Sequence, residues 1–311
     1  MKKLAFLFPG QGSQSIGMMS GWADNPAVRQ VMTTANNALN ENLSDLIAHG
    51  TPEQLGLTTN TQPVMLAASY AAYQAWIAAG GQTPTIMAGH SLGEYTAWVA
   101  SGAMDLADAI RTVRIRANAM QSAVPVGVGS MAAILGLDSA KVREICRSLS
   151  TDTAVVEAVN YNDPLQTVIA GHTSAVTAAI EACKLAGAKR GLILPVSAPF
   201  HSSLMRPVGD VLAITLEKIH LNTPYLPVIN NVDVSELTTS TDIKDALIRQ
   251  SYNPVRWVET INTMQKQGIT TFIECGPGKV LAGLLKRIAP EAMIYNIFDN
   301  DSLNMTLKVI Q

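Results

Sequence analysis

The sequence predicts an α/β protein in which a small βαββαβ domain is inserted into a larger body built on a parallel, helix-covered sheet. Two observations lead to this fold class. Short apolar segments alternate with helical segments in the first 125 residues and again after residue 198, which is the pattern of a parallel sheet. Between residues 128 and 197 the predicted elements follow the order βαββαβ, which is typical of ferredoxin-like domains.

The composition supports a folded protein with an ample core and excludes several classes of function. The chain has 311 residues, of which 48% are hydrophobic and 15% charged, with a formal net charge of −2. This balance excludes intrinsic disorder and argues against non-specific binding of nucleic acid, which requires net positive charge.

Cysteine usage and apolar runs indicate the compartment. Cys146, Cys183 and Cys275 lie far apart without a CxxC pair, which fits a reducing compartment and argues against a disulfide framework or a zinc site. The apolar run Leu4–Phe8 is shorter than the ~7–15 residues of an export signal, and none approaches the ~18 of a membrane span. We therefore expect a soluble, cytoplasmic protein without a membrane segment.

The body begins with a buried strand. Leu4–Phe8 predicts this strand, and a Gly-rich turn follows it. Residues 63–79 predict a buried helix, because they are apolar almost all round, begin with Pro63 and end at Gly80. The remaining elements of this half are a strand over 85–88 and helices over 92–100 and 105–122.

A hinge of small residues, Pro125 to Gly129, precedes the inserted elements. These are strands over 131–136, 154–160, 166–170 and 192–196 and helices over 139–149 and 174–186. We predict a small domain over 128–197 and a large domain formed by 1–127 and 198–311.

The second half of the body follows Pro199. It is predicted to contain helices over 203–219, 242–251, 255–267, 279–288 and 301–310 and strands over 228–231, 271–274 and 292–298.

The strongest chemical motif is Gly89-His90-Ser91-Leu92-Gly93, a G-x-S-x-G between a predicted strand and a predicted helix. Small residues on both sides allow a sharp turn that exposes the serine, so Ser91 is the candidate nucleophile. The N–H of Leu92, at the start of the helix, is directed toward negative charge that develops beside Ser91.

A nucleophilic serine needs a base, and His201 is the best candidate among the histidines. It lies in the loop where the chain re-enters the large domain, and such loops commonly carry catalytic groups. The other histidines have settings that suggest other roles. His49 lies in a polar turn, His90 is the neighbour of the nucleophile, His172 lies in a loop or cap, and His220 lies at a helix end. No acidic residue between 91 and 201 stands in a recognisable setting, so a neutral group remains an alternative for orienting the histidine.

Arg116 lies beside the apolar stripe of helix 105–122, about 60° from its centre on a helical wheel, whereas Arg111 and Arg114 point outward. A half-buried guanidinium requires an anionic partner, and its planar fork suits a carboxylate. That partner is either a ligand or an Asp or Glu of the protein.

Two Gly-rich turns are weak candidates for phosphate loops. The turn from Gly10 to Ser15 lacks the third small residue and the later acid of a dinucleotide fingerprint, which argues against a nicotinamide cofactor. The turn at Gly276 lacks the Walker pattern and is better explained as a tight strand-to-helix turn.

Taken together, the motifs resemble one enzyme family. The chain from residue 4 to about 288 is similar to the malonyl-CoA:acyl-carrier-protein transacylases of bacterial fatty-acid synthesis and the acyltransferase domains of polyketide synthases. The resemblance rests on Phe8-Pro9-Gly10-Gln11-Gly12-Ser13-Gln14, Ala88–Tyr95, Arg114-Ile115-Arg116, Phe200–Met205 and Glu274–Leu281, in this order.

The resemblance implies a hydrolase-like α/β body with a ferredoxin-like insert, and it implies roles for seven residues. Ser91 is the nucleophile and His201 the base, oriented by backbone carbonyls near Gln250 rather than by an acid. The N–H groups of Gln11 and Leu92 form the oxyanion hole. Arg116 binds the malonyl carboxylate, and Gln250 helps to position Arg116. Phe200 sterically disfavours methyl-branched substrates.

The implied reaction is ping-pong transfer of malonyl from coenzyme A, through a malonyl-serine ester, to the phosphopantetheine thiol of acyl carrier protein. No cofactor or metal is implied, and we expect a monomer that binds its acidic carrier protein transiently. Basic docking candidates are Lys189-Arg190, Lys279 and Lys286-Arg287, although such charges are also common on ordinary solvated surfaces. The alternatives are a serine esterase or thioesterase, for which Arg116 would be pointless, and a malonyl-CoA-responsive scaffold without turnover.

Overall fold

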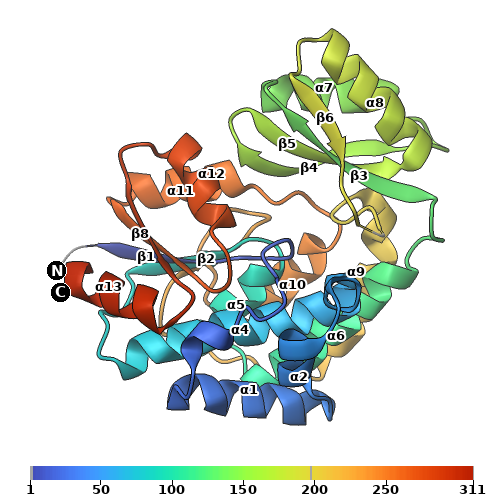
Figure 1. The fold of residues 1–311 in the computed structure, drawn as a ribbon. Helices are drawn as coiled ribbons and strands as arrows, with labels where there is room; N and C mark the ends of the chain where they lie inside the picture. The colour runs from blue at the N-terminus through green and yellow to red at the C-terminus, as the bar shows by residue number, and fades with distance from the viewer. Residues whose placement is uncertain (1–2, 197, 311) are drawn as a thin grey trace.

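The computed structural model describes residues 3–196 and 198–310 and contains two separate sheets (Figure 1). In the described chain, the larger sheet has five parallel strands in the order β7-β2-β1-β8-β9. Their bounds are β1 Leu4–Phe8, β2 Ile86–Gly89, β7 Val228–Ile229, β8 Thr271–Cys275 and β9 Met293–Ile297. The predicted α/β class with a parallel sheet is confirmed.

Strand β1 lies at the centre of this sheet, and its side chains alternate between two cores. Phe6 and Phe8 belong to the larger core, whereas Ala5 and Leu7 belong to the core on the opposite face. All five residues of β1 are buried, as a strand covered by helices on both faces requires.

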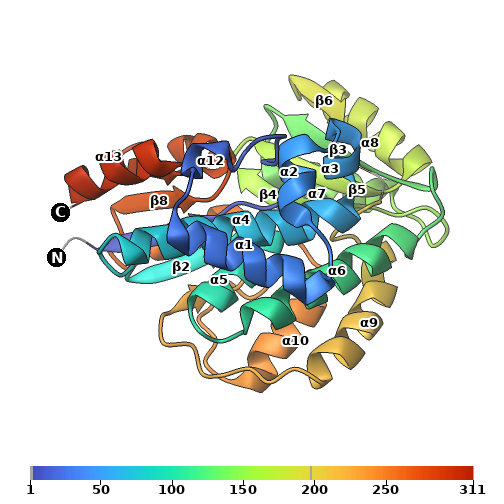
Figure 2. The same cartoon turned by 60° about the horizontal axis from the view of Figure 1, so that its bottom comes forward.

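Helices cover both faces of the larger sheet (Figures 1 and 2). The helices packed in the larger core are α1 Pro26–Leu39, α2 Leu43–His49, α3 Pro52–Gly56, α4 Thr58–Ala78, α5 Leu92–Ala100, α6 Leu106–Ser122, α9 Arg206–Glu217, α10 Ser240–Gln250 and α13 Asn300–Ile310. The opposite face is covered by α11 Trp257–Lys266 and α12 Val280–Ile288.

The second sheet is antiparallel, and its order within the described residues is β4-β5-β3-β6. Its strands are β3 Gly129–Leu135, β4 Val156–Asp163, β5 Gln166–His172 and β6 Arg190–Ile193, with helices α7 Ser139–Leu149 and α8 Thr173–Leu185 on one face. This is the predicted ferredoxin-like arrangement. The exact domain boundaries stay a prediction, and Ser197, at the second boundary, lies outside the described residues.

The small sheet is joined to the body at β4. The N–H of Val255 donates to the carbonyl of Val159, and the N–H of Tyr161 donates to the carbonyl of Val255. Arg287, in α12, forms an ion pair with Asp163 at the end of β4, with Nε 2.5 Å from Oδ2. These contacts fix one wall of the cleft described below. Arg287, predicted as a surface residue, thus also has a structural partner.

Several predicted boundaries were wrong. Helix α4 begins at Thr58 rather than at Pro63, which lies inside the helix. Thr58, Thr61 and Gln62, before Pro63, are buried, and a tertiary contact holds the first of them, since Thr58 Oγ1 donates to Gln11 Oε1. The helix predicted over 203–219 is divided into a 3₁₀ turn, Ser203–Met205, and α9, so His220 follows a helix instead of ending it.

Helices α1, α2 and α3 were not predicted, although local signals for them exist in the sequence. Asn25 caps α1 with Pro26 at the first helical position, and Thr51 and Gln54 form a capping box at α3. Within the described chain, no helix combines the length and hydrophobicity needed to cross a lipid bilayer.

Candidate active site

Ser91 lies on a sharp turn between β2 and α5, in a strained backbone conformation. Its φ is 52° and its ψ is −108°, a region that non-glycine residues rarely occupy. The Ser91 N–H donates to Asn231 Oδ1 at 2.8 Å, and Asn231 Nδ2 donates to the Gly89 carbonyl at 2.8 Å. The side chain of Asn231, at the end of β7, therefore holds both arms of the turn.

The glycines of the motif are required by close packing of backbone on backbone. A Cβ at Gly93 would lie 2.0 Å from the Phe8 carbonyl oxygen, and one at Gly89 would lie 1.8 Å from the Gly93 carbonyl carbon. A Cβ at Gly10 would lie 2.5 Å from the His90 carbonyl oxygen. The loop after β1 and the serine turn can approach each other only because these positions lack side chains.

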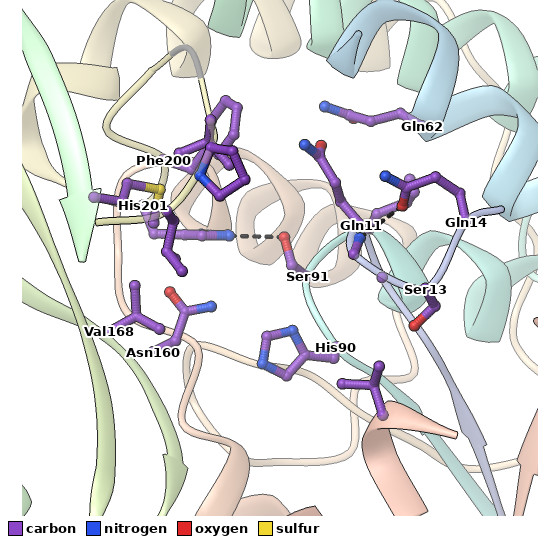
Figure 3. A pocket seen from close by; sticks show the side chains of 18 of the residues that line it. Gln11, Ser13, Gln14, Gln62, His90, Ser91, Asn160, Val168, Phe200 and His201 are labelled. Atoms are coloured by element: carbon purple, nitrogen blue, oxygen red, sulfur yellow. Dashed lines mark hydrogen bonds between the residues drawn. The ribbon is translucent and has the colours of Figure 1, made fainter. Parts of the chain in front are cut away.

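His201 meets Ser91 from the other side of the cleft (Figure 3). Its Nε2 lies 2.7 Å from Ser91 Oγ, and its Nδ1 lies 2.8 Å from the backbone carbonyl of Gln250. A carbonyl can only accept, so the proton of neutral His201 resides on Nδ1 and Nε2 is left to accept from the serine hydroxyl. The partner of Nδ1 is a neutral group, which was one of the alternatives left open by the sequence.

Arg116 lies deeper than the helical wheel indicated, since its exposed fraction is only 2%. Its Nη1 donates to Gln62 Oε1 at 2.8 Å, and its Nη2 donates to Gln250 Oε1 at 3.0 Å and to Ser91 Oγ at 3.2 Å. Among the described residues, the hydrogen-bond partners of Arg116 are therefore two side-chain amides and a hydroxyl. None of them is the Asp or Glu of the protein that the sequence left open as its partner. Burial lowers the pKa of Arg116 from its usual range.

Gln11 and Leu92 lie beside Ser91 at the same end of the cleft. Leu92 is the first residue of α5, so its N–H belongs to the group at a helix start that lacks an intrahelical acceptor. The side chain of Gln11 is tethered because Thr58 Oγ1 donates to Gln11 Oε1 at 2.8 Å. The oxyanion hole that the resemblance implies for these two N–H groups stays a prediction.

A cleft of about 900 Å³ lies over these residues, between the small sheet and the body (Figure 3). Ser91, His201 and Arg116 are among the polar residues that line it. Its apolar walls include side chains from both parts of the chain: Met120, Met131, Val168, Leu194, Phe200 and Leu284. The cleft can admit a long, partly apolar chain that ends in a polar group.

The sequence of residues 5–293 matches the family model described as the acyl transferase domain. The chain belongs to the acyl transferase family. A malonyl CoA-acyl carrier protein transacylase of Escherichia coli (strain K12) is 50% identical over 289 residues, which cover 93% of each chain. One of Bacillus subtilis (strain 168) is 42% identical, covering 100% of this chain and 98% of its own.

Solved structures agree with this family assignment. An acyl-carrier-protein S-malonyltransferase from Burkholderia pseudomallei 1710b superimposes with a TM-score of 0.96 and 55% identity, covering 98% of this chain and 99% of its own. A second match is a chain from the structure of a type II PKS acyl-carrier protein in complex with its malonyl-transacylase. It superimposes with a TM-score of 0.97 and 45% identity, covering 99% of this chain and 100% of the matched chain.

Three residues of this acyl transferase site were missed by sequence reasoning: Gln62, Glu94 and Asn231. Each is a polar side chain that is at least 98% buried and is hydrogen-bonded to Arg116, Gln250 or the serine turn. The available signal was weak: a single charged residue, Glu94, in the mostly apolar helix predicted over 92–100. His90, expected to be structural, donates from Nε2 to Asn162 Oδ1 at 2.8 Å and packs against Trp257.

The pH dependence of this acyl transferase is expected to lack an inflection near 6.5. Burial, with a smaller contribution from the charge of Arg116, lowers the pKa of His201 from 6.5 to about 3. His201 is therefore expected to stay neutral throughout the range from pH 5 to pH 8, and kcat/KM for malonyl-CoA should not fall as the pH drops through 6.5. A clear fall centred near 6.5 in stable enzyme would contradict this prediction.

The same shift has an effect on stability with a definite sign. Because the folded pKa lies below the unfolded one, the unfolded state binds the additional proton, so stability is lost as the pH falls from 6.5 toward 3. Thermal melting at each pH serves as the control that separates unfolding from protonation of the base.

Proposed function

We propose that this acyl transferase transfers malonyl from malonyl-CoA to the phosphopantetheine thiol of acyl carrier protein, through an ester on Ser91. The observation that carries the proposal is the meeting of three groups: Ser91 Oγ, His201 Nε2 at 2.7 Å and Arg116 Nη2 at 3.2 Å. A nucleophile with its base is common to many hydrolases, but a buried arginine beside the nucleophile selects an acyl group that carries a carboxylate.

In the first half-reaction, Ser91 Oγ attacks the thioester carbonyl of malonyl-CoA while His201 Nε2 takes the hydroxyl proton. The C–S bond then breaks, and the same proton passes from Nε2 to the departing thiolate. His201 returns to its neutral form, and malonyl remains on Ser91 as an ester.

The N–H groups of Gln11 and Leu92 stabilise the oxyanion that forms during this attack. They are backbone donors on two rigid segments that approach closely because Gly10 lacks a side chain. Donors that are already in place need no reorganisation as charge develops, so their contribution is greatest in the transition state.

Arg116 binds the malonyl carboxylate through its planar fork. Gln62 and Gln250 accept from its two terminal nitrogens and so fix the plane of the guanidinium. Phe200 lines the same cleft, and its ring leaves little room for an α-methyl group, so methylmalonyl is disfavoured by its size.

In the second half-reaction, the phosphopantetheine thiol of the carrier protein gives its proton to His201 and attacks the Ser91 ester. The ester C–O bond breaks, and Ser91 Oγ recovers the proton. Coenzyme A leaves before the carrier protein binds, and malonyl ends as a thioester on the carrier thiol, so the kinetics are ping-pong. No cofactor takes part, the enzyme acts as a monomer in the cytoplasm, and the product supplies fatty-acid chain elongation.

The test of this function is transfer of labelled malonyl from coenzyme A to purified carrier protein, run in parallel with acetyl-CoA and methylmalonyl-CoA. We expect malonyl to reach the carrier protein and the other two acyl groups to be transferred far more slowly. Release of free malonate without carrier-bound label would support a thioesterase instead. Absence of both turnover and acylated Ser91 would support a scaffold without activity.

Docking of the acidic carrier protein is expected to depend on the exposed basic residues near the small sheet and α12. Neutralising Lys189, Arg190 and Lys286 with glutamine should raise the apparent KM for the carrier protein several-fold, about as expected for loss of electrostatic steering. The KM for malonyl-CoA should remain unchanged.

The matched control is Lys308→Gln, because Lys308 is exposed on α13, which packs on the opposite face of the larger sheet from α12. Arg287 is left in place because it pairs with Asp163. Equal increases in the KM for both substrates would contradict this docking surface.

A further inference from the structure

Glu94 is a buried carboxylate three residues after Ser91, and the scheme above gives it no role. It lies in the first turn of α5 with an exposed fraction of 0%. A charged side chain is rarely buried completely unless it is hydrogen-bonded. Its surroundings therefore call for a specific explanation.

Two of the hydrogen bonds to Glu94 come from residues that support the active site. Its Oε2 accepts from the Asn231 N–H at 2.9 Å and from Gln250 Nε2 at 2.9 Å. Its Oε1 accepts from Trp98 Nε1 at 3.2 Å. Asn231 holds the serine turn and Gln250 holds Arg116, so one carboxylate anchors the supports of both.

The direction of these hydrogen bonds has a consequence for Gln250. An ionised carboxylate can only accept, so it faces the NH₂ end of the Gln250 amide. That NH₂ also donates to the Ser91 carbonyl at 2.9 Å. The Gln250 oxygen is thereby turned toward Arg116, where it accepts from Nη2 at 3.0 Å.

We propose that Glu94 is a positioning residue that sets the orientation of the Gln250 amide and through it aims Arg116 at the carboxylate of the acyl group. An inverted amide would place oxygen against oxygen at Glu94 and at Ser91, and NH₂ against the guanidinium at Arg116. Loss of the carboxylate leaves the buried donors of Gln250 and Asn231 without one acceptor each, which favours rearrangement. This inference rests on the proposed function, because only a carboxylated acyl group depends on Arg116.

The test compares two replacements of Glu94 by the ratio of malonyl to acetyl transfer. Glu94→Gln can keep an oxygen toward Asn231 and Gln250, whereas Glu94→Met has similar length and offers no acceptor. We expect the ratio to fall by roughly tenfold or more in the Met variant and to stay within about threefold of wild type in the Gln variant. The ratio does not depend on the folded fraction of the preparation.

The Gln variant turns its own NH₂ toward Trp98 Nε1, so a second version carries Trp98→Phe to remove that clash. Glu274→Gln is the matched control: Glu274 is 1% exposed and accepts from the N–H groups of Leu281 and Ala282. It supports the start of α12 rather than Gln250, so its variant should leave the ratio unchanged. Should the Met variant fail to fold, Glu94→Ala takes its place under the same expectations.

The results separate this inference from the proposed function. An unchanged ratio in the Met variant, or an equal fall in the Gln and Met variants, overturns the role of Glu94 as an acceptor that orients Gln250. A wild-type enzyme that transfers no malonyl overturns the proposed function instead.

Discussion

Replacing Ser91 with alanine should reduce malonyl transfer by roughly 10⁵-fold or more, since loss of a nucleophile removes the covalent route altogether. The hydroxyl at this position is held by a strained turn and is 2.7 Å from His201 Nε2, and water cannot replace it in that geometry. The measurement is transfer of labelled malonyl to carrier protein. Mass spectrometry of the peptide that contains Ser91 should detect malonyl in the wild type after incubation with malonyl-CoA alone.

The control for this variant is Ser122→Ala, at the end of α6, where Oγ donates to the Asn118 carbonyl at 2.6 Å. This variant should transfer malonyl at the wild-type rate. If the Ser91 variant retained substantial transfer, or if malonyl were found on another residue, the covalent scheme would be wrong.

Replacing Arg116 with alanine should lower the rate of malonyl transfer by roughly 10²–10³-fold. This is about the loss in rate expected when a charge-assisted, bidentate hydrogen bond is removed from a site shielded from water. Acetyl transfer should change far less, because acetyl has no carboxylate to bind. Arg116→Lys should recover little of the loss, since a lysine offers a point charge where the site is built for a planar fork. The measurement is kcat/KM for both acyl-CoA substrates.

Arg114→Ala is the matched control for Arg116, two residues along the same helix. Its guanidinium donates to both carboxylate oxygens of Glu41, at 2.8 and 2.7 Å, on the outside of the protein. This variant should keep the malonyl-to-acetyl ratio of the wild type. An equal loss of acetyl and malonyl transfer in the Arg116 variant would contradict the role of Arg116 in binding the carboxylate.

Local patterns were sufficient wherever chemistry and chain geometry coincide in a short segment. The G-x-S-x-G motif predicts the turn at Ser91 because the close contact of Gly89 with Gly93 lies within the strand, the turn and the helix themselves. The order of elements similarly predicted the βαββαβ sheet of the insert. The wheel placed Arg116 near the buried side of its helix, although the residue is more deeply buried than one helix can indicate.

The polar network under the site could not be found in this way. Gln62, Glu94 and Asn231 come from three segments, and a single polar residue in an apolar helix or at a strand end has no distinctive local pattern. Their importance follows from hydrogen bonds between residues 54 to 156 positions apart in the sequence, such as those from Arg116 to Gln62 and from Gln250 to Glu94. The start of α4 was misplaced for a related reason, since the residues before Pro63 are stabilised by tertiary contacts.

The α/β class, the inserted small sheet, the serine turn and a short set of candidate groups could all be predicted from the amino-acid sequence, because each depends on hydrophobic periodicity or on steric demands within a few residues. Which of those groups meet depends on the three-dimensional fold. Folding brings His201 and Gln250 to Ser91 across 110 and 159 positions of sequence. Packing of the core fixes such distances, since burying apolar surface on both faces of the sheet leaves few arrangements of the loops at its edge.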